Sequence, residues 1–350
     1  MTRIVDLPTP ALIVDRQKFD ANVATMAAVR PGLTLRPHIK AHKSTALAHE
    51  LAKVGHTAFT CATPREVIGM VQAGLGSDLL LANETVDPVR LRAMAALLNN
   101  SRVTVAIDSD VTARMAAENG IKDVLIDVNV GMPRCGVLPD RAATLAAFAV
   151  SLGLNVRGVM GYEGHLMAVA DRDEQRAKVR SAMDVLVECF DQVRAQSGDD
   201  CTIISAGGTG TFDLYDPSDP LLARVNEVQA GSYALMDSHY GALELPFVQA
   251  LYVVGTVISV SDSWAVIDVG LKSLGMDHGN PTIEGASVWF CSDEHITFSM
   301  KDDRPLPGIG NRVLVRPAHI DPTIALHEVM HVVDQIGTVI DAWPVNLRHW

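Results

Sequence analysis

Short apolar runs alternate with longer segments of helical periodicity from residue 33 to about residue 240. Eight runs follow this pattern: LTLRPHIK, AFTCAT, DLLLAN, VTVAID, VLIDVNV, VRGVMGY, TIISAGG and NEVQAGSYAL. Near-continuous apolar strands are typical of parallel sheets that are covered on both faces. Eight strand-helix units in about 200 residues fit a (β/α)8 barrel better than an open doubly wound sheet. The sequence therefore predicts an α/β protein built on a TIM-type (β/α)8 barrel.

Beyond residue 245 the pattern changes to strands separated by turn residues, as in SWAVIDVG, ASVWFC, NRVLVRP and GTVIDAWPV. A chain of 350 residues is also longer than the roughly 250–300 residues at which one core stops growing. We expect residues 16–245 to form the barrel and residues 246–350 to form an all-β domain. The apolar segment PALIVD, within residues 1–15, is expected to join the sheet of that second domain.

Composition limits the partners of this chain. Charged residues make up 20%, and no window of about 18 uninterrupted apolar residues could span a membrane. The net charge of −12 has no compensating Lys/Arg stripe, which argues against nucleic acid and anionic membranes as partners. The N-terminal residues lack a signal-peptide core, and the 5 cysteines are scattered without a C-x-x-C pair. We expect a cytoplasmic protein with a small-molecule substrate and no disulfide framework.

HEVMH, residues 327–331, matches the zinc-peptidase signature, in which two histidines one helical turn apart bind the metal. The residues that follow alternate like a β-hairpin around a turn at residues 335–337. On a strand, His327 and His331 would stand about 13 Å apart at about 3.3 Å per residue, too far to bind one ion. A zinc peptidase therefore stays only a distant alternative.

A lysine ends the first predicted strand. In LRPHIKAHKS, Lys40 lies amid His38, His42 and Lys43. Barrel enzymes carry their chemistry at the C-terminal ends of the strands, and cationic neighbours favour the neutral amine that a Schiff-base nucleophile requires. Taken alone, the position fits an ordinary solvated lysine at the barrel mouth better than a Schiff-base nucleophile.

Two glycine-rich turns end the seventh and eighth strands, in SAGGTGTFD and VQAGSYALMD. Their glycines allow backbone N–H groups to approach an anion, with hydroxyl groups beside them. Phosphate sites in these barrels commonly form after strands seven and eight. A strand-end lysine together with a phosphate site indicates pyridoxal phosphate (PLP), which needs an amine partner at one end and an anion site at the other.

Six motifs in a fixed order cover nearly the whole chain: RPHIKAHKS, DVNVGMPRCGV, GYEGH, SAGGTGT, EVQAGSYALMD and PAHIDPT. The pattern resembles the D-threonine aldolase and D-serine dehydratase group, which has an alanine racemase-like barrel (fold type III) and a C-terminal β domain. The resemblance implies that Lys40 forms the internal aldimine, that Arg134 lies beside the cofactor ring oxygen and that Tyr162 packs at the ring. The residues that it implies for the phosphate are Thr209, Gly210, Gly231, Ser232 and Tyr233. Without it, Arg134 fits a strand-end salt bridge and Tyr162 a core aromatic.

The same resemblance places a divalent metal at His319 and Asp321 of PAHIDPT. In an extended segment, residues two apart point to the same side, so the imidazole and the carboxylate can converge on one ion. In this group the second ligand resembles cysteine in the dehydratases and aspartate in the aldolases, so Asp321 favours an aldolase. The oxygen ligand also suits Mn²⁺ or Mg²⁺ better than Zn²⁺, which is the third candidate.

The resemblance implies a PLP- and metal-dependent aldolase that cleaves β-hydroxy-D-amino acids, with D-threonine giving glycine and acetaldehyde as the representative reaction. His165 of GYEGH is the expected base for the hydroxyl proton. The alternatives are a dehydratase of D-serine or 3-hydroxy-D-aspartate, a 3-hydroxy-D-aspartate aldolase, and a non-catalytic PLP-binding protein. Racemase-like enzymes pair head to tail, so a homodimer is expected.

Overall fold

The computed structural model describes residues 2–350, which form two compact units. The barrel unit contains residues 27–40 and 48–231 together with Trp350. The β unit contains the residues up to Met26, residues 41–47 and residues 232–349. No described helix is long and apolar enough to cross a membrane.

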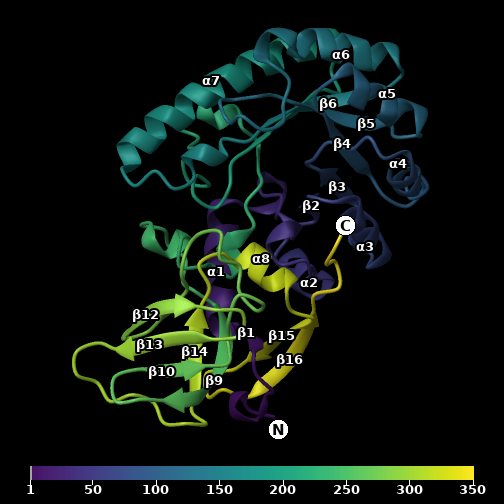
Figure 1. Ribbon diagram of the computed structural model, residues 1–350. Coiled ribbons are helices and arrows are strands. Elements are labelled where there is room, and N and C mark those ends of the chain that lie inside the picture. Colours follow the sequence, from purple (N-terminus) through teal and green to yellow (C-terminus); the bar gives the residue numbers. More distant parts are fainter. Residues whose placement is uncertain (1) are drawn as a thin grey trace. The chain divides into compact units, whose positions relative to one another are not determined.

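Parallel strands in the order β2-β3-β4-β5-β6-β7-β8 form the sheet of the barrel unit (Figure 1). Their bounds are β2 (Ala58–Cys61), β3 (Asp78–Leu81), β4 (Val103–Ile107), β5 (Asp123–Asp127), β6 (Asn155–Gly161), β7 (Ile203–Ala206) and β8 (Glu227–Val228).

The run that contains residues 35–38 joins the two edges of this sheet. Leu35 bridges Val228 of β8 and His38 bridges Thr60 of β2, both in parallel, so this run takes the eighth position of the barrel. It forms no regular strand, and Pro37 within it has no N–H to donate to a neighbouring strand. The predicted (β/α)8 barrel is confirmed, with one position filled by isolated bridges.

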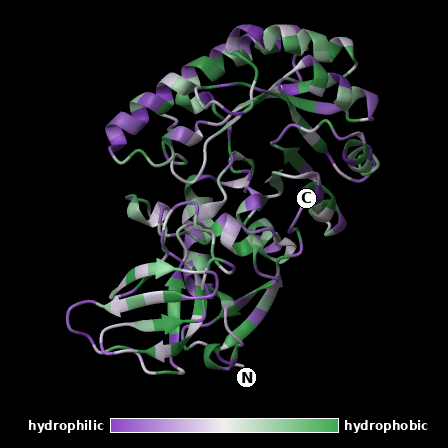
Figure 2. Cartoon of the chain, viewed as in Figure 1, coloured by the Kyte–Doolittle hydropathy of each residue, from purple (hydrophilic) through white to green (hydrophobic). Residues whose placement is uncertain are grey.

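Helices separate the strands and cover their outer side. Figure 1 shows α4 to α7 outside β3 to β6. In Figure 2 hydrophilic and hydrophobic residues alternate along α7, as expected of a helix that buries one face. The bounds are α1 (Arg16–Val29), α2 (Thr45–Lys53), α3 (Pro64–Gln72), α4 (Pro88–Ala95), α5 (Asp110–Glu118), α6 (Ala142–Ser151) and α7 (Arg172–Ser197).

Side-chain caps define where these helices begin. The Thr63 hydroxyl accepts a hydrogen bond from the N–H of Glu66, with Pro64 at the first helical position of α3. Asp87 and Asp171 accept hydrogen bonds in the same way at the starts of α4 and α7. Inside the barrel, strands β3 to β6 contribute one buried apolar cluster: Leu80, Ala106, Leu125 and Met160.

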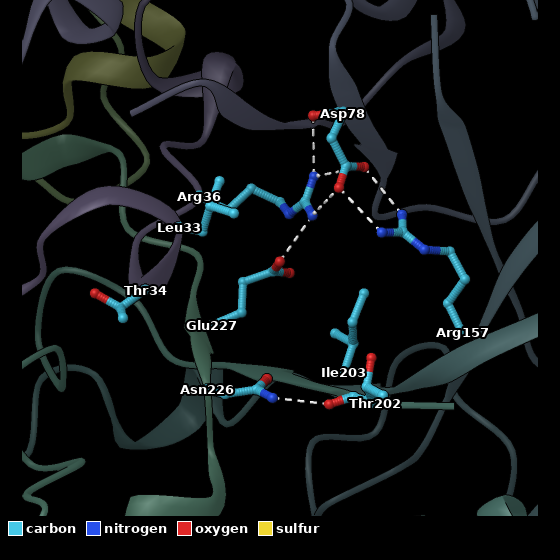
Figure 3. Close-up of a pocket in the computed structure, with 9 residues that line it drawn as sticks. All are labelled: Leu33, Thr34, Arg36, Asp78, Arg157, Thr202, Ile203, Asn226 and Glu227. Atoms are coloured by element: carbon cyan, nitrogen blue, oxygen red, sulfur yellow. Dashed lines mark hydrogen bonds and ion pairs between the residues drawn. The ribbon is translucent and has the colours of Figure 1, made fainter. Parts of the chain in front are cut away.

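A charged network lies at the N-terminal ends of the barrel strands (Figure 3). Arg36 donates to Glu227 at 2.7 Å, and Arg157 donates to Asp78 at 2.9 Å. In Figure 3 both guanidinium groups point toward Asp78, beside a cavity of about 290 Å³. Burial acts to raise the pKa of Asp78, but hydrogen bonds and charge from Arg157 and Arg36 hold that pKa below its usual value. This end of a barrel serves stability rather than catalysis.

The β unit is built on a mostly antiparallel sheet in the order β12-β13-β10-β9-β1-β15-β16, with β14 pairing both β9 and β11. The N-terminal strand β1 (Ala11–Asp15) lies between β9, which is antiparallel to it, and β15, which is parallel. The other strands are β9 (Leu251–Val260), β10 (Ala265–Ile267), β11 (Thr282–Ile283), β12 (Ala286–Cys291), β13 (Ile296–Met300), β14 (Arg312–Arg316), β15 (Val329–Val333) and β16 (Val339–Pro344).

The HEVMH motif is not helical. Strands β15 and β16 form an antiparallel hairpin, and His331 lies on β15 opposite Ala342. His327 does not lie on the strand as expected, because it follows the short helix α8 (Ile320–Ala325) and sits before β15 begins. Its Nε2 lies 2.9 Å from the carbonyl oxygen of Ser273. The two histidines therefore lack the helical spacing that a zinc peptidase requires.

Candidate active site

The residues expected to bind the cofactor lie just after the C-terminal ends of the barrel strands. Parallel strands present their C-terminal ends on the same face of a barrel, where the loops build the active site. Lys40 lies in the 3-10 turn Ile39–Ala41, which follows the run of residues 35–38 that joins the two edges of the sheet. The backbone N–H of Lys40 lies 3.4 Å from Nδ1 of His38. The other residues on loops at this end are Arg134, Tyr162, His165, Thr209, Gly210 and Gly231. Ser232 and Tyr233, in the 3-10 turn Ser232–Ala234, belong to the β unit.

Arg134 and Tyr162, both expected at the cofactor ring, lie against each other. The guanidinium carbon of Arg134 is 5.1 Å from the centroid of the Tyr162 ring, within the range of a cation-π contact. Tyr162 directly follows β6, and Arg134 lies in the loop after β5. The two loops therefore place a cation and an aromatic face together at the end of adjacent strands.

His165 packs across the same pair of loops. A Cβ atom added to Gly131 would lie 3.3 Å from Cε1 of the His165 ring, so the imidazole occupies the space that this glycine leaves open. Gly131 also has a φ of 117°, which side chains rarely adopt. The position of His165 thus depends on a glycine from the loop after β5.

The turn of residues 207–211, after β7, has the features of a phosphate site. The N–H of Thr211 donates to the carbonyl of Gly208, and the N–H of Gly208 donates to the hydroxyl of Thr211. Gly210 is buried, and among residues 2–350 no acceptor is paired with its N–H. A buried N–H needs an acceptor, and a phosphate oxygen provides one. The turn therefore fits the phosphate of PLP.

In the β unit, His319 and Asp321 lie at the start of α8 rather than in the extended segment that was expected. His319 is the N-cap residue, with φ −142° and ψ 121°, and Asp321 is in the first turn. Because His319 keeps an extended backbone, its Nε2 still comes within 3.9 Å of Oδ1 of Asp321. Ligand bonds of about 2.0–2.2 Å from each atom can span that distance, so the pair fits a divalent ion.

Asp277 controls which nitrogen of His319 faces Asp321. Its Oδ2 lies 2.7 Å from Nδ1 of His319, and this carboxylate-histidine contact leaves Nε2 for a metal. Burial acts to raise the pKa of Asp277, but the hydrogen bond and charge of His319 hold that pKa below its usual value. Asp277 was not predicted from the sequence, since no motif marks a residue 42 positions before its partner.

His278 stacks on His319, with ring centroids 4.0 Å apart and ring planes 4° from parallel. The ligand atoms of Asp277, His278 and His319 all lie within 4.8 Å of one another, so this group also has the spacing of a metal site. In a parallel stack, however, each nitrogen lone pair lies in its own ring plane, and the two imidazoles do not converge on one ion. His278 therefore stacks on His319, the candidate ligand, but does not bind the same ion.

Buried Asp237 holds the start of α8. Its carboxylate accepts hydrogen bonds from the N–H groups of Ile320 at 3.2 Å and Tyr240 at 2.8 Å. Burial raises the pKa of Asp237, although these hydrogen bonds oppose the shift. The same carboxylate thus fixes the backbone between His319 and Asp321.

Comparison with known proteins gives the family. Residues 14–239 match the family model "Alanine racemase, N-terminal domain", and residues 250–333 match "Putative serine dehydratase domain". A D-threonine aldolase from an Arthrobacter species is 33% identical, over 97% of this chain and 92% of that protein. The chain belongs to the D-threonine aldolase and D-serine dehydratase family. This family consists of PLP-dependent enzymes of fold type III that act on small amino acids, and the chain is a lyase.

Two further relatives match this chain over most of their own length. A 3-hydroxy-D-aspartate aldolase from Paracoccus denitrificans is 28% identical, over 98% of this chain and 92% of that protein. The crystal structure of D-threonine aldolase from Filomicrobium marinum superposes with a TM-score of 0.92 at 35% identity, covering 99% of this chain and 97% of that one. The resemblance inferred from the six motifs is therefore confirmed.

Proposed function

We propose that the protein is a PLP- and divalent-metal-dependent aldolase that cleaves β-hydroxy-D-amino acids to glycine and an aldehyde. One observation carries the proposal: an aspartate oxygen, not a cysteine sulfur, lies 3.9 Å from Nε2 of the candidate ligand His319. An oxygen and a nitrogen donor with open positions around them suit a hard cation that also binds a substrate hydroxyl. Mn²⁺ or Mg²⁺ is the proposed ion.

Lys40 is the residue that would hold the cofactor, with Arg134 and Tyr162 beside its ring. The proposed phosphate ligands are Thr209, Gly210, Gly231, Ser232 and Tyr233. When bound, PLP supplies an electron sink for the negative charge left on the α-carbon after bond cleavage. The cation-π contact between Arg134 and Tyr162 holds the two side chains next to each other, where the cofactor ring would bind.

His319 and Asp321 would bind the ion, and Asp277 keeps Nε2 of His319 turned toward it. When bound, the ion supplies a Lewis acid that lowers the pKa of the substrate β-hydroxyl. His165 is the proposed base that accepts the hydroxyl proton, because a histidine ring nitrogen can act as a general base. The absence of a Cβ atom at Gly131 leaves room for the His165 ring in this position.

A dehydratase acting on D-serine or 3-hydroxy-D-aspartate is the second candidate, since the same residues could assist the departure of hydroxide. Product analysis separates the two reactions. The protein should be incubated with PLP, Mn²⁺ and, separately, D-threonine, 3-hydroxy-D-aspartate and D-serine. Glycine plus an aldehyde supports the aldolase and identifies the β-substituent, whereas ammonia plus a 2-oxo acid refutes it. A His319→Ala protein serves as the control for metal-independent background.

We also propose that the active protein is a homodimer, by analogy with racemase-like enzymes in which paired subunits complete each other's sites. Sedimentation equilibrium at the concentrations used for activity tests this directly. A dimeric mass is expected, and full activity from a monomer contradicts the proposal.

A further inference from the structure

Glu163 is a fully buried carboxylate between Tyr162 and His165, and no role for it follows from the proposed reaction. We propose that Glu163 is a positioning residue that fixes the turn of residues 207–211 in the shape that receives the cofactor phosphate. This inference rests on the proposed binding of PLP at that turn.

Three donors converge on Glu163. Its Oε2 accepts a hydrogen bond from the N–H of Gly207 at 3.2 Å. Its Oε1 accepts from the hydroxyls of Thr211 at 2.8 Å and Tyr215 at 2.5 Å. A carboxyl group offers an acceptor oxygen at both ends, whereas a glutamine would place an NH₂ group against one of these donors. The two oxygens of Glu163 therefore satisfy all three buried donors.

These contacts determine the backbone of the turn. The Thr211 hydroxyl, while donating to Glu163, also accepts from the N–H of Gly208, so one carboxylate fixes both ends of the turn. Gly207 has a φ of 80°, and a Cβ atom there would lie 2.6 Å from the Tyr215 ring. The N–H of Gly210 stays outside this network, which leaves it to the ligand.

The opposite side of the turn is held by Gln175 of α7, which is also fully buried. Its amide Nε2 donates to the carbonyls of Leu166 at 2.7 Å and Gly210 at 3.2 Å. Glu163 accepts and Gln175 donates, so both link the loop after β6 to the turn after β7. The loop after β6 and the 207–211 turn thus share one set of buried hydrogen bonds.

Glu163→Gln tests the proposal, with Glu227→Gln as a matched control. Glu227 is a buried carboxylate of the same barrel unit, but it bonds Arg36 and Ser205 at the N-terminal ends of the strands. The apo proteins are titrated with PLP by absorbance or fluorescence, and hydrogen exchange is followed in the peptide that contains residues 207–211. We expect Glu163→Gln to raise the Kd for PLP at least ~10-fold, equal to about 1.4 kcal/mol, and to speed exchange in this peptide. Glu227→Gln should leave both unchanged.

Equal losses in the two variants would show a general effect of removing a buried charge and overturn the proposal, as would wild-type affinity in Glu163→Gln. If Glu163→Gln does not fold, Thr211→Val should weaken PLP binding and Thr211→Ser, which keeps the hydroxyl, should restore it. Equal affinity in these two variants also overturns the proposal. Failure of the wild-type protein to bind PLP refutes the proposed function instead, and hydrogen exchange in the apo variants still tests the placement of the turn by Glu163.

Discussion

Asp277 and His319 are joined through Oδ2 and Nδ1 at 2.7 Å, and this contact leaves Nε2 of His319 facing Asp321. Carboxylate partners of metal-binding histidines fix the ring orientation and the tautomer. Without this contact, the His319 imidazole would exchange between two tautomers and several rotamers. The contact with Asp277 therefore presets the His319 ring in the orientation that the proposed metal site requires.

Replacing Asp277 with Asn should weaken metal binding by about 10- to 100-fold, the range typical of partners of this kind. Free Mn²⁺ can be measured by electron paramagnetic resonance during a titration of the protein. His319→Ala should lose binding altogether, while both variants should bind PLP as the wild type does. Unchanged Mn²⁺ affinity in Asp277→Asn would show that the contact does not orient the ligand.

Substitutions in HEVMH should spare the metal. Glu328 is exposed and pairs only loosely with Arg348, at 3.5 Å, so Glu328→Ala should retain both Mn²⁺ and lyase activity. His331→Ala alters a half-buried position on β15 and should cost at most about 0.5–3 kcal/mol of stability. A metal-loaded but inactive Glu328→Ala protein would mean that the motif supplies a catalytic base after all.

Lys40 should carry the cofactor. Reduction of the PLP-loaded protein with borohydride should leave a pyridoxyl group on Lys40, detected by peptide mass spectrometry. Lys40→Ala should lose both this group and the visible absorbance, whereas Lys43→Ala should keep them. A pyridoxyl group on Lys43 in the wild-type protein would contradict the assignment.

The charged network at the N-terminal ends of the strands should make stability depend on pH. The pKa of Asp78 is lower in the folded state, so its contribution is present above the ordinary aspartate pKa of about 3.9 and is lost as the pH falls through the folded-state value. Asp78→Asn should cost about 0.5–3 kcal/mol at pH 7 and progressively less below pH about 4. Urea unfolding at several pH values measures this difference, which should not grow as the pH falls.

Periodicity was sufficient to predict the barrel, because the strands from β2 to β7 are short, apolar and buried. The first predicted strand is not regular, because Pro37 interrupts its pairing. The extended segment predicted at PAHIDPT is replaced by a short helix. Sequence spacing also placed His327 on a strand, although α8 ends just before it. These misses lie at boundaries between elements, where one residue's backbone conformation decides the outcome.

The positioning residues could not be predicted from the sequence. Glu163 contacts Thr211 across 48 positions, and Asp277 contacts His319 across 42. Neither pair shares a motif, and each contact exists only once two loops are folded against one another. Motifs gave residues expected to touch the cofactor or metal, whereas the structure was needed to identify the buried groups that hold them.

Product analysis of D-threonine cleavage before and after removal of the metal tests whether the protein is a metal-dependent aldolase. With PLP and Mn²⁺ we predict equal amounts of glycine and acetaldehyde. A chelator should stop cleavage while leaving the PLP absorbance intact, because Lys40 and the 207–211 turn bind without the ion, and added Mn²⁺ should restore activity. Formation of ammonia and a 2-oxo acid, or cleavage that persists in the chelator, would contradict a metal-dependent aldolase.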